Sequence, residues 1–453
     1  MAVFEKRSTL GAPADALFGW HASPGAFERL APPWETLRII GRTGSIRDGD
    51  RLTFQLRKWP AWITWEAVHR GFVEGEQFVD EQLRGPFRRW VHTHRFERVD
   101  AGRSALVDHV DFEPPFAAIT KSTVRREIER MFRWRHERTR LDVERHQRFR
   151  NRPQMRVVIA GASGLVGTEL AAFLTAGGHS VLRLVRGRAR GADEIGWGPG
   201  RGALDAAALE GIDAVVHLGG VTIAKRFTAA HKQAIRESRV ESTALLARAI
   251  AGLSQRPRVF LCASAIGYYG NRGDEEVSER SAAGTGFLPD VCTEWEEAAR
   301  PARDAGVRVA NLRLGIVLAA KGGALAAMMR PFRLGLGGVV GSGRQWMSWI
   351  TLEDVIGAFH HVLMTDSVQG PVNVVAPNPV TNREFTKTLG RVLGRPTLAP
   401  APAFAIRAIL GQMGQALLLD GARVRPDVLA GSGFTSAFPS LEHGLRHELG
   451  RYR

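Results

Sequence analysis

One short segment, residues 155–167, most strongly limits what this chain can fold into. Its first part, Met155–Ala160, is an apolar run of the kind that forms a parallel strand buried on both faces. The glycine-rich sequence GASGLVG follows directly, and the next residues have helical spacing until Gly177 and Gly178. A strand, a glycine-rich turn and a helix in this order are typical of dinucleotide binding. The alternative is a glycine-rich turn that binds no ligand.

Each glycine of this turn has a physical task. Gly161 allows the tight turn, Gly164 lets a pyrophosphate approach the backbone at the helix N-terminus, and Gly167 lets helix and strand pack closely. Another predicted strand, Asp213–Leu218, ends in two glycines. The predicted cofactor-binding residues are Gly161, Ser163, Gly164, Leu165, Val166, Gly167, Arg186, Leu218, Gly219 and Gly220.

The end of the second predicted strand, Ser180–Val185, indicates which dinucleotide is bound. A protein that binds NAD usually has Asp or Glu there, to hold the ribose 2′-hydroxyl. This chain instead continues with Arg186, Arg188 and Arg190. Guanidinium groups suit a 2′-phosphate, so the sequence favours NADP over NAD, with Arg186 as the first candidate for that contact.

The chain has room for two or three domains, because it has 453 residues and domains usually run to about 100–200. Its composition changes at residues 150–154, where a segment rich in Arg, Trp and Phe is followed by one rich in glycine and alanine. We therefore expect one domain over residues 1–150 and another over residues 154–453. In the second, apolar strands alternate with helical stretches. This alternation predicts a doubly wound α/β sheet of the Rossmann type, with the cofactor across the carboxyl ends of its strands.

The first 150 residues combine alternating strands with helices. A strand at Ala2–Lys6 and short helices at 12–20 and 26–30 precede several strands, and a long polar helix, Lys121–Arg148, closes the segment. This order, the turn at residues 49–52 and the stretch WEAVHRGFVEGEQFVDEQ resemble the START-like polyketide cyclase/dehydrase (SRPBCC) superfamily. The resemblance implies an α+β helix-grip domain that holds an apolar ligand between its sheet and its long helix.

The long helix is strongly basic, and Phe132 and Trp134 stand among its arginines. Such a pattern suits a nucleic acid or an anionic membrane surface. Acidic residues at pairing distance favour a solvated helix with one apolar stripe instead. The solvated helix is therefore the favoured interpretation, and nucleic-acid binding through Lys121–Arg148 is the alternative.

From Met155 onward, the chain resembles the epimerase-like branch of the extended short-chain dehydrogenases/reductases. The matching stretches include GASGLVG, SRVESTALL, SAIGYYG, LRLGIVLAAKGGAL and GPVNVVAPNPVTNREFT. The resemblance implies an NAD(P)-dependent epimerase or dehydratase fold with a small C-terminal substrate region and a helical extension from about residue 400. It also implies a small-molecule substrate, without naming one.

The catalytic set of that superfamily, Asn, Ser, Tyr and Lys, is only partly present. Ser264 matches the Ser that binds the substrate oxygen. The positions of Tyr and Lys fall near Val291 and Trp295, and the position of Asn holds Arg239. A tyrosine activated by a neighbouring lysine is therefore absent from the expected place.

Two interpretations follow. In the first, the chain is an NADP-dependent oxidoreductase or epimerase-like enzyme, in which Ser264 orients the substrate and Tyr269, or alternatively Tyr268, transfers a proton. In the second, catalysis is lost, and NADP is a sensor or structural ligand coupled to an apolar ligand of the first domain. The predicted substrate contacts are Arg239, Arg344 and Gln345.

Further features bear on location and partners. The chain has two cysteines, Cys262 and Cys292, and no apolar run long enough to span a membrane, so we expect a cytoplasmic protein. Its net charge of +16 favours anionic partners such as a phosphorylated cofactor. His92 and His94 lack acidic partners at useful sequence spacing, and no His-Glu-x-x-His motif occurs, so we predict no metal site.

Overall fold

The computed structural model describes residues 1–58 and 60–452, which form two compact units. Within the described residues, no helix is both long enough and apolar enough to cross a membrane. The first unit comprises residues 1–153, 172–178 and 449–453, and the second comprises residues 154–171 and 179–448.

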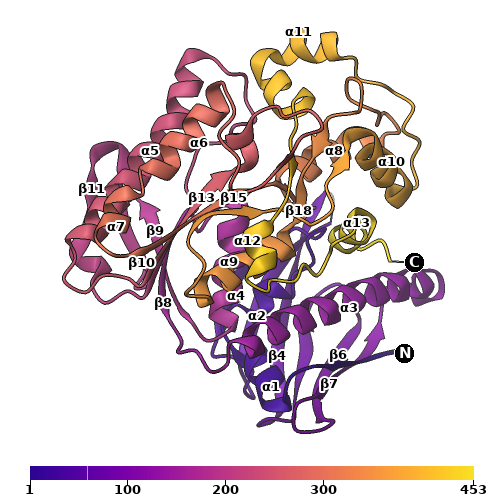
Figure 1. The fold of residues 1–453 in the computed structure, drawn as a ribbon. Coiled ribbons are helices and arrows are strands. Elements are labelled where there is room, and N and C mark those ends of the chain that lie inside the picture. Colours follow the sequence, from indigo (N-terminus) through magenta and orange to yellow (C-terminus); the bar gives the residue numbers. More distant parts are fainter. Residues whose placement is uncertain (59, 453) are drawn as a thin grey trace. The chain divides into compact units, whose positions relative to one another are not determined.

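The first unit is built on a seven-stranded antiparallel sheet in the order β1-β7-β6-β5-β4-β3-β2. Two short helices follow the first strand, and one long helix, α3, follows the last (Figure 1). The elements are β1 Ala2–Leu10, α1 Ala14–Ala22, α2 Ala26–Arg29, β2 Leu37–Thr43, β3 Arg51–Lys58, β4 Ala61–Val73, β5 Gln77–Arg84, β6 Arg89–Arg98, β7 Ser104–Glu113 and α3 Ala117–Arg148. This is the order of elements expected from the sequence, to which the structure adds β2 and β6.

Side-chain periodicity explains how the sheet and α3 pack. Phe4 on β1 and Val110 on β7 are buried cross-strand partners, as alternating strands with one covered face require. Ile128 and Phe132, four residues apart on α3, belong to the same apolar cluster. Phe132 and Trp134, the aromatic residues that suggested a nucleic-acid face, are both 0% exposed. The apolar stripe expected on the basic helix is therefore present.

The second unit is an α/β domain with an eight-stranded sheet in the order β11-β10-β9-β8-β12-β13-β15-β19. Neighbouring strands are parallel, except that β11 pairs antiparallel with β10. The sheet strands are β8 Arg156–Ala160, β9 Ser180–Arg186, β10 Glu194–Gly198, β11 Ala203–Leu204, β12 Ala214–His217, β13 Val259–Ala265, β15 Arg308–Leu314 and β19 Gly370–Val374. The predicted Rossmann-type sheet is confirmed.

Strand β8 lies inside the sheet, with β9 on one side and β12 on the other. The chain runs outward from β8 through β9 to β11 on one side and then returns to β12 on the other side, so a crevice forms outside the carboxyl ends of β8 and β12. Such crevices bind ligands. Val157, Val158 and Ile159 in β8 are 0% exposed. This explains why the strand reads as an apolar run and not as an alternating one.

Helices and short strands complete the chain. The helices are α4 Leu165–Ala176, α5 Ala229–Gly252, α6 Phe287–Glu297, α7 Arg300–Asp304, α8 Gly323–Arg333, α9 Leu352–Met364, α10 Asn382–Leu393, α11 Ala403–Gly414, α12 Asp427–Gly431 and α13 Leu441–Leu449. The short strands pair as β14 Glu276–Val277 with β21 Arg423–Val424, β16 Ile316–Leu318 with β18 Trp349–Thr351, and β17 Trp346–Met347 with β20 Val380–Thr381. Residues 401–448 therefore belong to the second unit, in which β21 pairs with β14.

Candidate functional site

The glycine-rich turn after β8 has the backbone geometry of a phosphate-binding loop. Gly161 has a φ of +84°, and a Cβ there would lie 2.8 Å from the carbonyl carbon of Leu218. A Cβ on Gly167 would lie 2.2 Å from the carbonyl oxygen of Gly161, so α4 packs directly on the turn. Ser163 and Gly164, between these contacts, are exposed. The turn thus exposes its backbone at the N-terminus of a helix, where anions bind, and the Gly164 N–H closes it by donating to the Gly161 carbonyl oxygen at 3.0 Å.

The carboxyl end of β9, beside β8, carries an unpaired cation. Arg186 is the last residue of this strand and is exposed. Within the part of the chain that the structure describes, neither Arg186 nor Arg188 has a carboxylate partner, and the nearby Asp193 and Glu194 pair with Arg183. The exposed turn and this guanidinium fit a dinucleotide whose ribose carries a 2′-phosphate.

The end of β12 is held by a buried histidine that sequence reasoning missed. His217 Nδ1 accepts a hydrogen bond from the Gly219 backbone N–H at 3.2 Å, and Nε2 donates to Ser242 Oγ at 2.7 Å. Burial lowers the pKa of His217 to about 3, so the ring is neutral and Nδ1 can accept. The sequence feature that could have revealed this role is a histidine at the end of an apolar strand, separated by one residue from two glycines.

A row of polar side chains crosses the carboxyl ends of three adjacent strands. Ser264 on β13 is in register with Arg313 on β15, and Arg313 is in register with Asn373 on β19. Ser264 Oγ donates to Glu296 Oε1 at 2.6 Å. Arg313 Nε and Nη2 each donate to a Glu296 oxygen at 2.8 Å. Burial alone would lower the pKa of Arg313, but Glu296 and Tyr269 raise it above its ordinary value.

Sequence reasoning did not find Glu296, Arg313 or Asn373. Glu296 lies one residue beyond the expected Lys position, on α6, and the other two interrupt buried strands. The sequence feature that could have revealed them is a polar residue inside an otherwise apolar strand. Such a residue indicates a partner elsewhere in the fold, because burying a polar group is costly unless it is paired. The partner of Arg313 is Glu296 on α6, a helix that follows β13, and no spacing along the sequence indicates that pairing.

The first of the two tyrosines predicted for catalysis, Tyr269, is 0% exposed. It belongs to a 3₁₀ turn, Ile266–Tyr269, that directly follows β13. Its hydroxyl donates to Asn373 Oδ1 at 2.7 Å and accepts from Arg313 Nη1 at 3.0 Å. Burial raises the pKa of Tyr269, with Arg313 opposing that effect. To reach a substrate, this hydroxyl would have to leave both partners.

Tyr268, the alternative, has different surroundings. Its side chain is half-buried, and the guanidinium carbon of Arg313 lies 3.5 Å from the centroid of its ring. Within residues 1–58 and 60–452, the Tyr268 hydroxyl has no hydrogen-bond partner. Of the three predicted catalytic hydroxyls, those of Ser264 and Tyr269 are committed to protein partners, and that of Tyr268 is not.

Packing residues fill the positions where the superfamily has its Tyr and Lys. Val291 and Trp295 on α6 are both buried. Arg239, which stands in place of Asn, lies over the Trp295 ring and donates to the Val221 carbonyl oxygen at 3.2 Å. A Cβ on Gly220 would lie 3.0 Å from the Arg239 guanidinium carbon, so this glycine leaves room for the arginine. A contact between Arg239 and a substrate stays a prediction.

The other predicted substrate residues, Arg344 and Gln345, differ in how they are held. Arg344 is exposed and has no carboxylate partner among the described residues. Gln345 Nε2 donates to the carbonyl oxygens of Val340 at 3.0 Å and Leu418 at 2.8 Å. Gln345 therefore ties this segment to the C-terminal extension, and Arg344 is the residue left available to a ligand.

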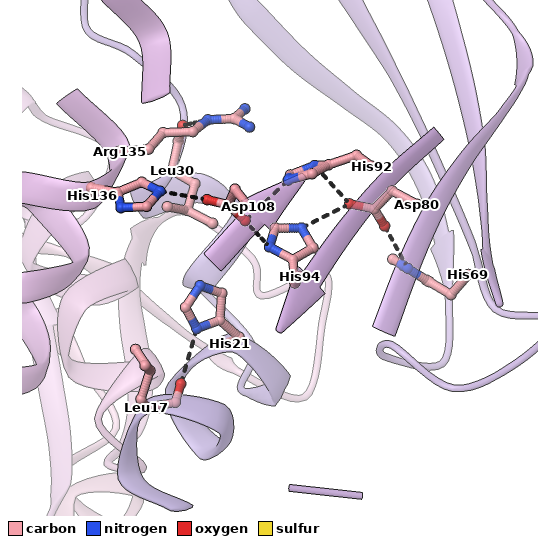
Figure 2. A network of polar contacts seen from close by, with 10 residues as sticks. All are labelled: Leu17, His21, Leu30, His69, Asp80, His92, His94, Asp108, Arg135 and His136. Carbon is pink, nitrogen blue, oxygen red and sulfur yellow. Dashed lines mark hydrogen bonds and ion pairs between the residues drawn. The ribbon is translucent and has the colours of Figure 1, made fainter. Parts of the chain in front are cut away.

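The first unit contains a cavity of about 610 Å³, lined mostly by apolar side chains. Part of its wall is polar and includes His92, His94 and Asp80 (Figure 2). The expectation that these histidines lack acidic partners is wrong. His94 Nε2 lies 3.3 Å from Asp80 Oδ2, and His92 Nε2 lies 3.0 Å from Asp108 Oδ1. These carboxylates come from neighbouring strands, and spacing along the sequence does not reveal cross-strand neighbours.

The buried carboxylates of this cluster determine which of its imidazole rings is charged. Burial opposes the charged forms of Asp108 and His94, but their mutual attraction is stronger. The pKa of Asp108 therefore lies well below its ordinary value, and that of His94 is raised to about 9. Burial lowers the pKa of His92 to about 4 and that of His21 to about 3. One charged imidazole thus lies among neutral rings and buried carboxylates.

The turn after β8, the cation at the end of β9 and the switch in strand order define a nucleotide-binding protein of the Rossmann class. Residues 157–375 match the model of the NAD dependent epimerase/dehydratase family, and residues 401–448 match that of a domain of unknown function, DUF1731. The second match confirms the C-terminal extension expected from about residue 400. Both matches lie beyond residue 156, so the START-like resemblance of residues 1–150 stays a prediction.

Similar proteins cover the chain to different extents. An epimerase family protein of Mycobacterium tuberculosis is 46% identical over 279 residues, which are 61% of this chain and 92% of the relative. The crystal structure of human epimerase family protein SDR39U1 with NADPH is 36% identical, with a TM-score of 0.60, over 64% of this chain and 98% of that one. The structure of a nucleoside-diphosphate sugar epimerase from Corynebacterium glutamicum is 32% identical, with a TM-score of 0.82, over 99% of this chain and 90% of that one. This chain belongs to the NAD dependent epimerase/dehydratase family.

The raised pKa of Tyr269 predicts a late ionisation in the folded protein. Replacing Tyr269 by Phe should remove an ionisation that occurs above the ordinary tyrosine value of about 10. Because the folded state holds this proton more tightly than the unfolded state, stability should fall as pH rises through that range, and less so in the variant. Absorbance at the phenolate band, followed against pH, measures the ionisation. The urea-unfolded protein is the control, and loss of an ionisation at or below the ordinary value would contradict the burial argument.

Proposed function

We propose that residues 154–453 form an NADP-dependent oxidoreductase or epimerase-like enzyme that acts on a small molecule. The observation that carries the proposal is the unpaired Arg186 at the end of β9, on the strand next to the exposed turn after β8. The human relative, solved with NADPH, supports the choice of this dinucleotide. Arg186 would bind the ribose phosphate, and the turn from Gly161 to Gly167 would bind the pyrophosphate, with residues 218–220 beside it.

When bound, the nicotinamide supplies or accepts a hydride. The chain must then move the proton of the reacting carbonyl or hydroxyl. We assign this step to Tyr268, which revises the preference for Tyr269, because only the Tyr268 hydroxyl is free of protein partners among the described residues. The Arg313 guanidinium, 3.5 Å from the ring centroid, is placed to stabilise the negative charge that develops as the phenol loses its proton.

Ser264 and Glu296 act in this proposal as positioning residues. Glu296 accepts two hydrogen bonds from Arg313 and one from Ser264, which fixes the guanidinium against the Tyr268 ring. Removing one partner of a buried ion pair costs about 3–5 kcal/mol, because the other charge is left uncompensated. The geometry beneath Tyr268 therefore depends on all three side chains.

For the substrate, we propose nucleoside-diphosphate sugars as the first class to test. The description of the Corynebacterium protein as an epimerase of such compounds supports this choice. Arg344 is exposed and has no carboxylate partner among the described residues, so its planar guanidinium suits a diphosphate. Arg239 keeps one face against Trp295 and is the second candidate contact.

For the first unit, we propose a START-like helix-grip domain over residues 1–150 that binds an apolar ligand. The antiparallel sheet followed by the long helix α3 supports the fold assignment. The cavity of about 610 Å³, with walls that include Phe54, Trp65 and Trp90, supports the ligand class.

Replacing Arg186 by Glu should weaken NADPH binding about tenfold or more, because a hydrogen bond to a charged group contributes about 1.5–3 kcal/mol. Binding of NADH, which lacks the 2′-phosphate, should change much less. Titrations followed by nicotinamide fluorescence measure both affinities. Arg248→Glu is the matched control, because Arg248 is an exposed arginine on α5 and the charge change is the same.

An equal loss of NADPH affinity in the Arg186 and Arg248 variants would attribute the effect to net charge and not to a contact. If the wild-type protein binds neither dinucleotide, the proposed function fails.

Replacing Tyr268 by Phe should lower turnover about 100-fold or more, because a positioned acid or base contributes about 10²–10⁴ to the rate. NADPH affinity should remain, since the phenol is not assigned a cofactor contact. Oxidation of NADPH, measured by absorbance over a panel of nucleotide sugars and their keto forms, finds the substrate and then compares the variants. Tyr269→Phe is the control and should lose less than about tenfold. The reverse order of the two variants would restore Tyr269 as the acid.

A further inference from the structure

Three side chains of metal-ligand type converge on the polar wall of the cavity in the first unit (Figure 2). His92 and His94 lie two residues apart on β6 and therefore point to the same face of the sheet. Asp80 on β5 is in register with His92. Asp80 Oδ2 lies 3.3 Å from His94 Nε2 and 3.8 Å from His92 Nδ1. The three ligand atoms all lie within 4.8 Å of one another.

A second carboxylate, that of Asp108, lies close to the other ring nitrogen of each imidazole, His92 Nε2 and His94 Nδ1. Asp108 Oδ1 lies 3.0 Å from His92 Nε2 and 2.7 Å from His94 Nδ1, and Asp108 Oδ2 accepts from His136 Nε2 at 2.8 Å. A bound cation would replace the proton between His94 Nε2 and Asp80 Oδ2, which are 3.3 Å apart, and the ring nitrogens of His92 and His94 nearest Asp80 would then present lone pairs toward it. Two lone pairs and one carboxylate oxygen then face a common point, an arrangement that a cation stabilises.

We propose that Asp80, His92 and His94 bind a divalent transition-metal ion of the Zn²⁺ or Fe²⁺ class. Two imidazole nitrogens and one carboxylate oxygen are ligands that these ions accept. Ligand atoms at about 2.1 Å from one ion, at tetrahedral angles, lie about 3.4 Å apart. The two separations from Asp80, 3.3 and 3.8 Å, are close to that value, and the two histidine ligand atoms lie within 4.8 Å of each other.

The surrounding partners are those that a metal site uses to orient its ligands. Metal-bound histidines usually donate their second N–H to a carboxylate, as His92 Nε2 is placed to do toward Asp108 at 3.0 Å. His94 Nδ1 lies 2.7 Å from the same Asp108 oxygen, at ion-pair distance but without hydrogen-bond geometry. The ligating carboxylate has a further contact, because His69 Nδ1 lies 2.7 Å from Asp80 Oδ1, at ion-pair distance but without hydrogen-bond geometry. This contact leaves Asp80 Oδ2 directed at the two histidines.

The metal ion would keep an open coordination position toward the cavity. All three ligands line the cavity, and the Asp80 side chain retains 26% exposure, whereas that of Asp108 retains 4%. The remaining walls include the aromatic side chains of Phe27, Phe54, Trp65, Phe87 and Trp90. The ligand class that fits is an apolar molecule with one oxygen or nitrogen donor that completes the coordination of the metal.

The competing arrangement is a hydrogen-bonded His–Asp cluster in which a proton occupies the point between Asp80 and His94. It would bind no metal, and titration with a metal separates the two arrangements. The metal proposal shares no residue with the nicotinamide site of residues 154–453. The two proposals can therefore fail independently.

The test is a titration of the full-length, chelator-treated protein with CoCl₂, followed by visible d–d absorption and by calorimetry. We expect one Co²⁺ per chain, a spectrum typical of nitrogen and oxygen ligands in four or five coordination, and displacement by Zn²⁺. Azide, a small donor, should change the Co²⁺ spectrum by entering the open position. No saturable Co²⁺ binding would overturn the proposal, and a spectrum that azide leaves unchanged would overturn the open position.

Near-isosteric variants locate the site. Asp80→Asn and His94→Gln should each weaken Co²⁺ binding about tenfold or more, and Asp108→Asn should weaken it about 10–100-fold, as removal of an outer partner does. His109→Gln, on the same strand as Asp108 and beside it in sequence, is the matched control and should bind Co²⁺ like the wild type.

Undiminished binding in the Asp80→Asn, His94→Gln double variant would place the metal elsewhere and overturn the assignment. Near-UV circular dichroism identifies any variant that does not fold. In that case, the spectrum and stoichiometry of the wild-type protein still decide the proposal. NADPH affinity, measured on the same samples, should not change with these substitutions.

Discussion

Lateral strand register is the physical constraint on which both candidate sites depend. In the second unit, it places Ser264 beside Arg313 at the carboxyl ends of β13 and β15. In the first unit, it places Asp80 beside His92 on β5 and β6. A slip by one residue would turn every side chain of a strand to the opposite face. The buried apolar residues that fix each register therefore also assemble the polar groups.

Charge pairing explains how polar groups can be buried at these edges. The Arg313 side chain is 3% exposed and forms two hydrogen bonds with Glu296, so the cation loses its water without being left unpaired. In the superfamily pattern, a lysine on the helix after the serine strand supplies the positive charge beside the tyrosine. In this chain that helix position is Trp295, and the charge comes from the neighbouring strand. The proposed chemistry thus keeps a cation at the tyrosine but changes the element that provides it.

The cofactor side of the fold could be predicted from the sequence because its signals are local. An apolar strand, a glycine-rich turn and a helix occupy adjacent residues, and Gly161 and Gly167 have the contacts expected of them. The catalytic side could not be predicted in the same way. Arg313 and Glu296 are 17 residues apart, and only the fold brings them together. The same limit led to the wrong expectation for His92, whose carboxylate partners lie on other strands.

The central claim is that the second unit binds NADPH at the carboxyl ends of β8, β9 and β12. Hydrogen–deuterium exchange of the full chain, with and without NADPH, tests it most directly. The account predicts slower exchange in residues 161–168, 186–190 and 218–221, with no change in the strands that line the cavity of the first unit. Protection confined to those cavity strands, or no protection at the turn after β8, would contradict it.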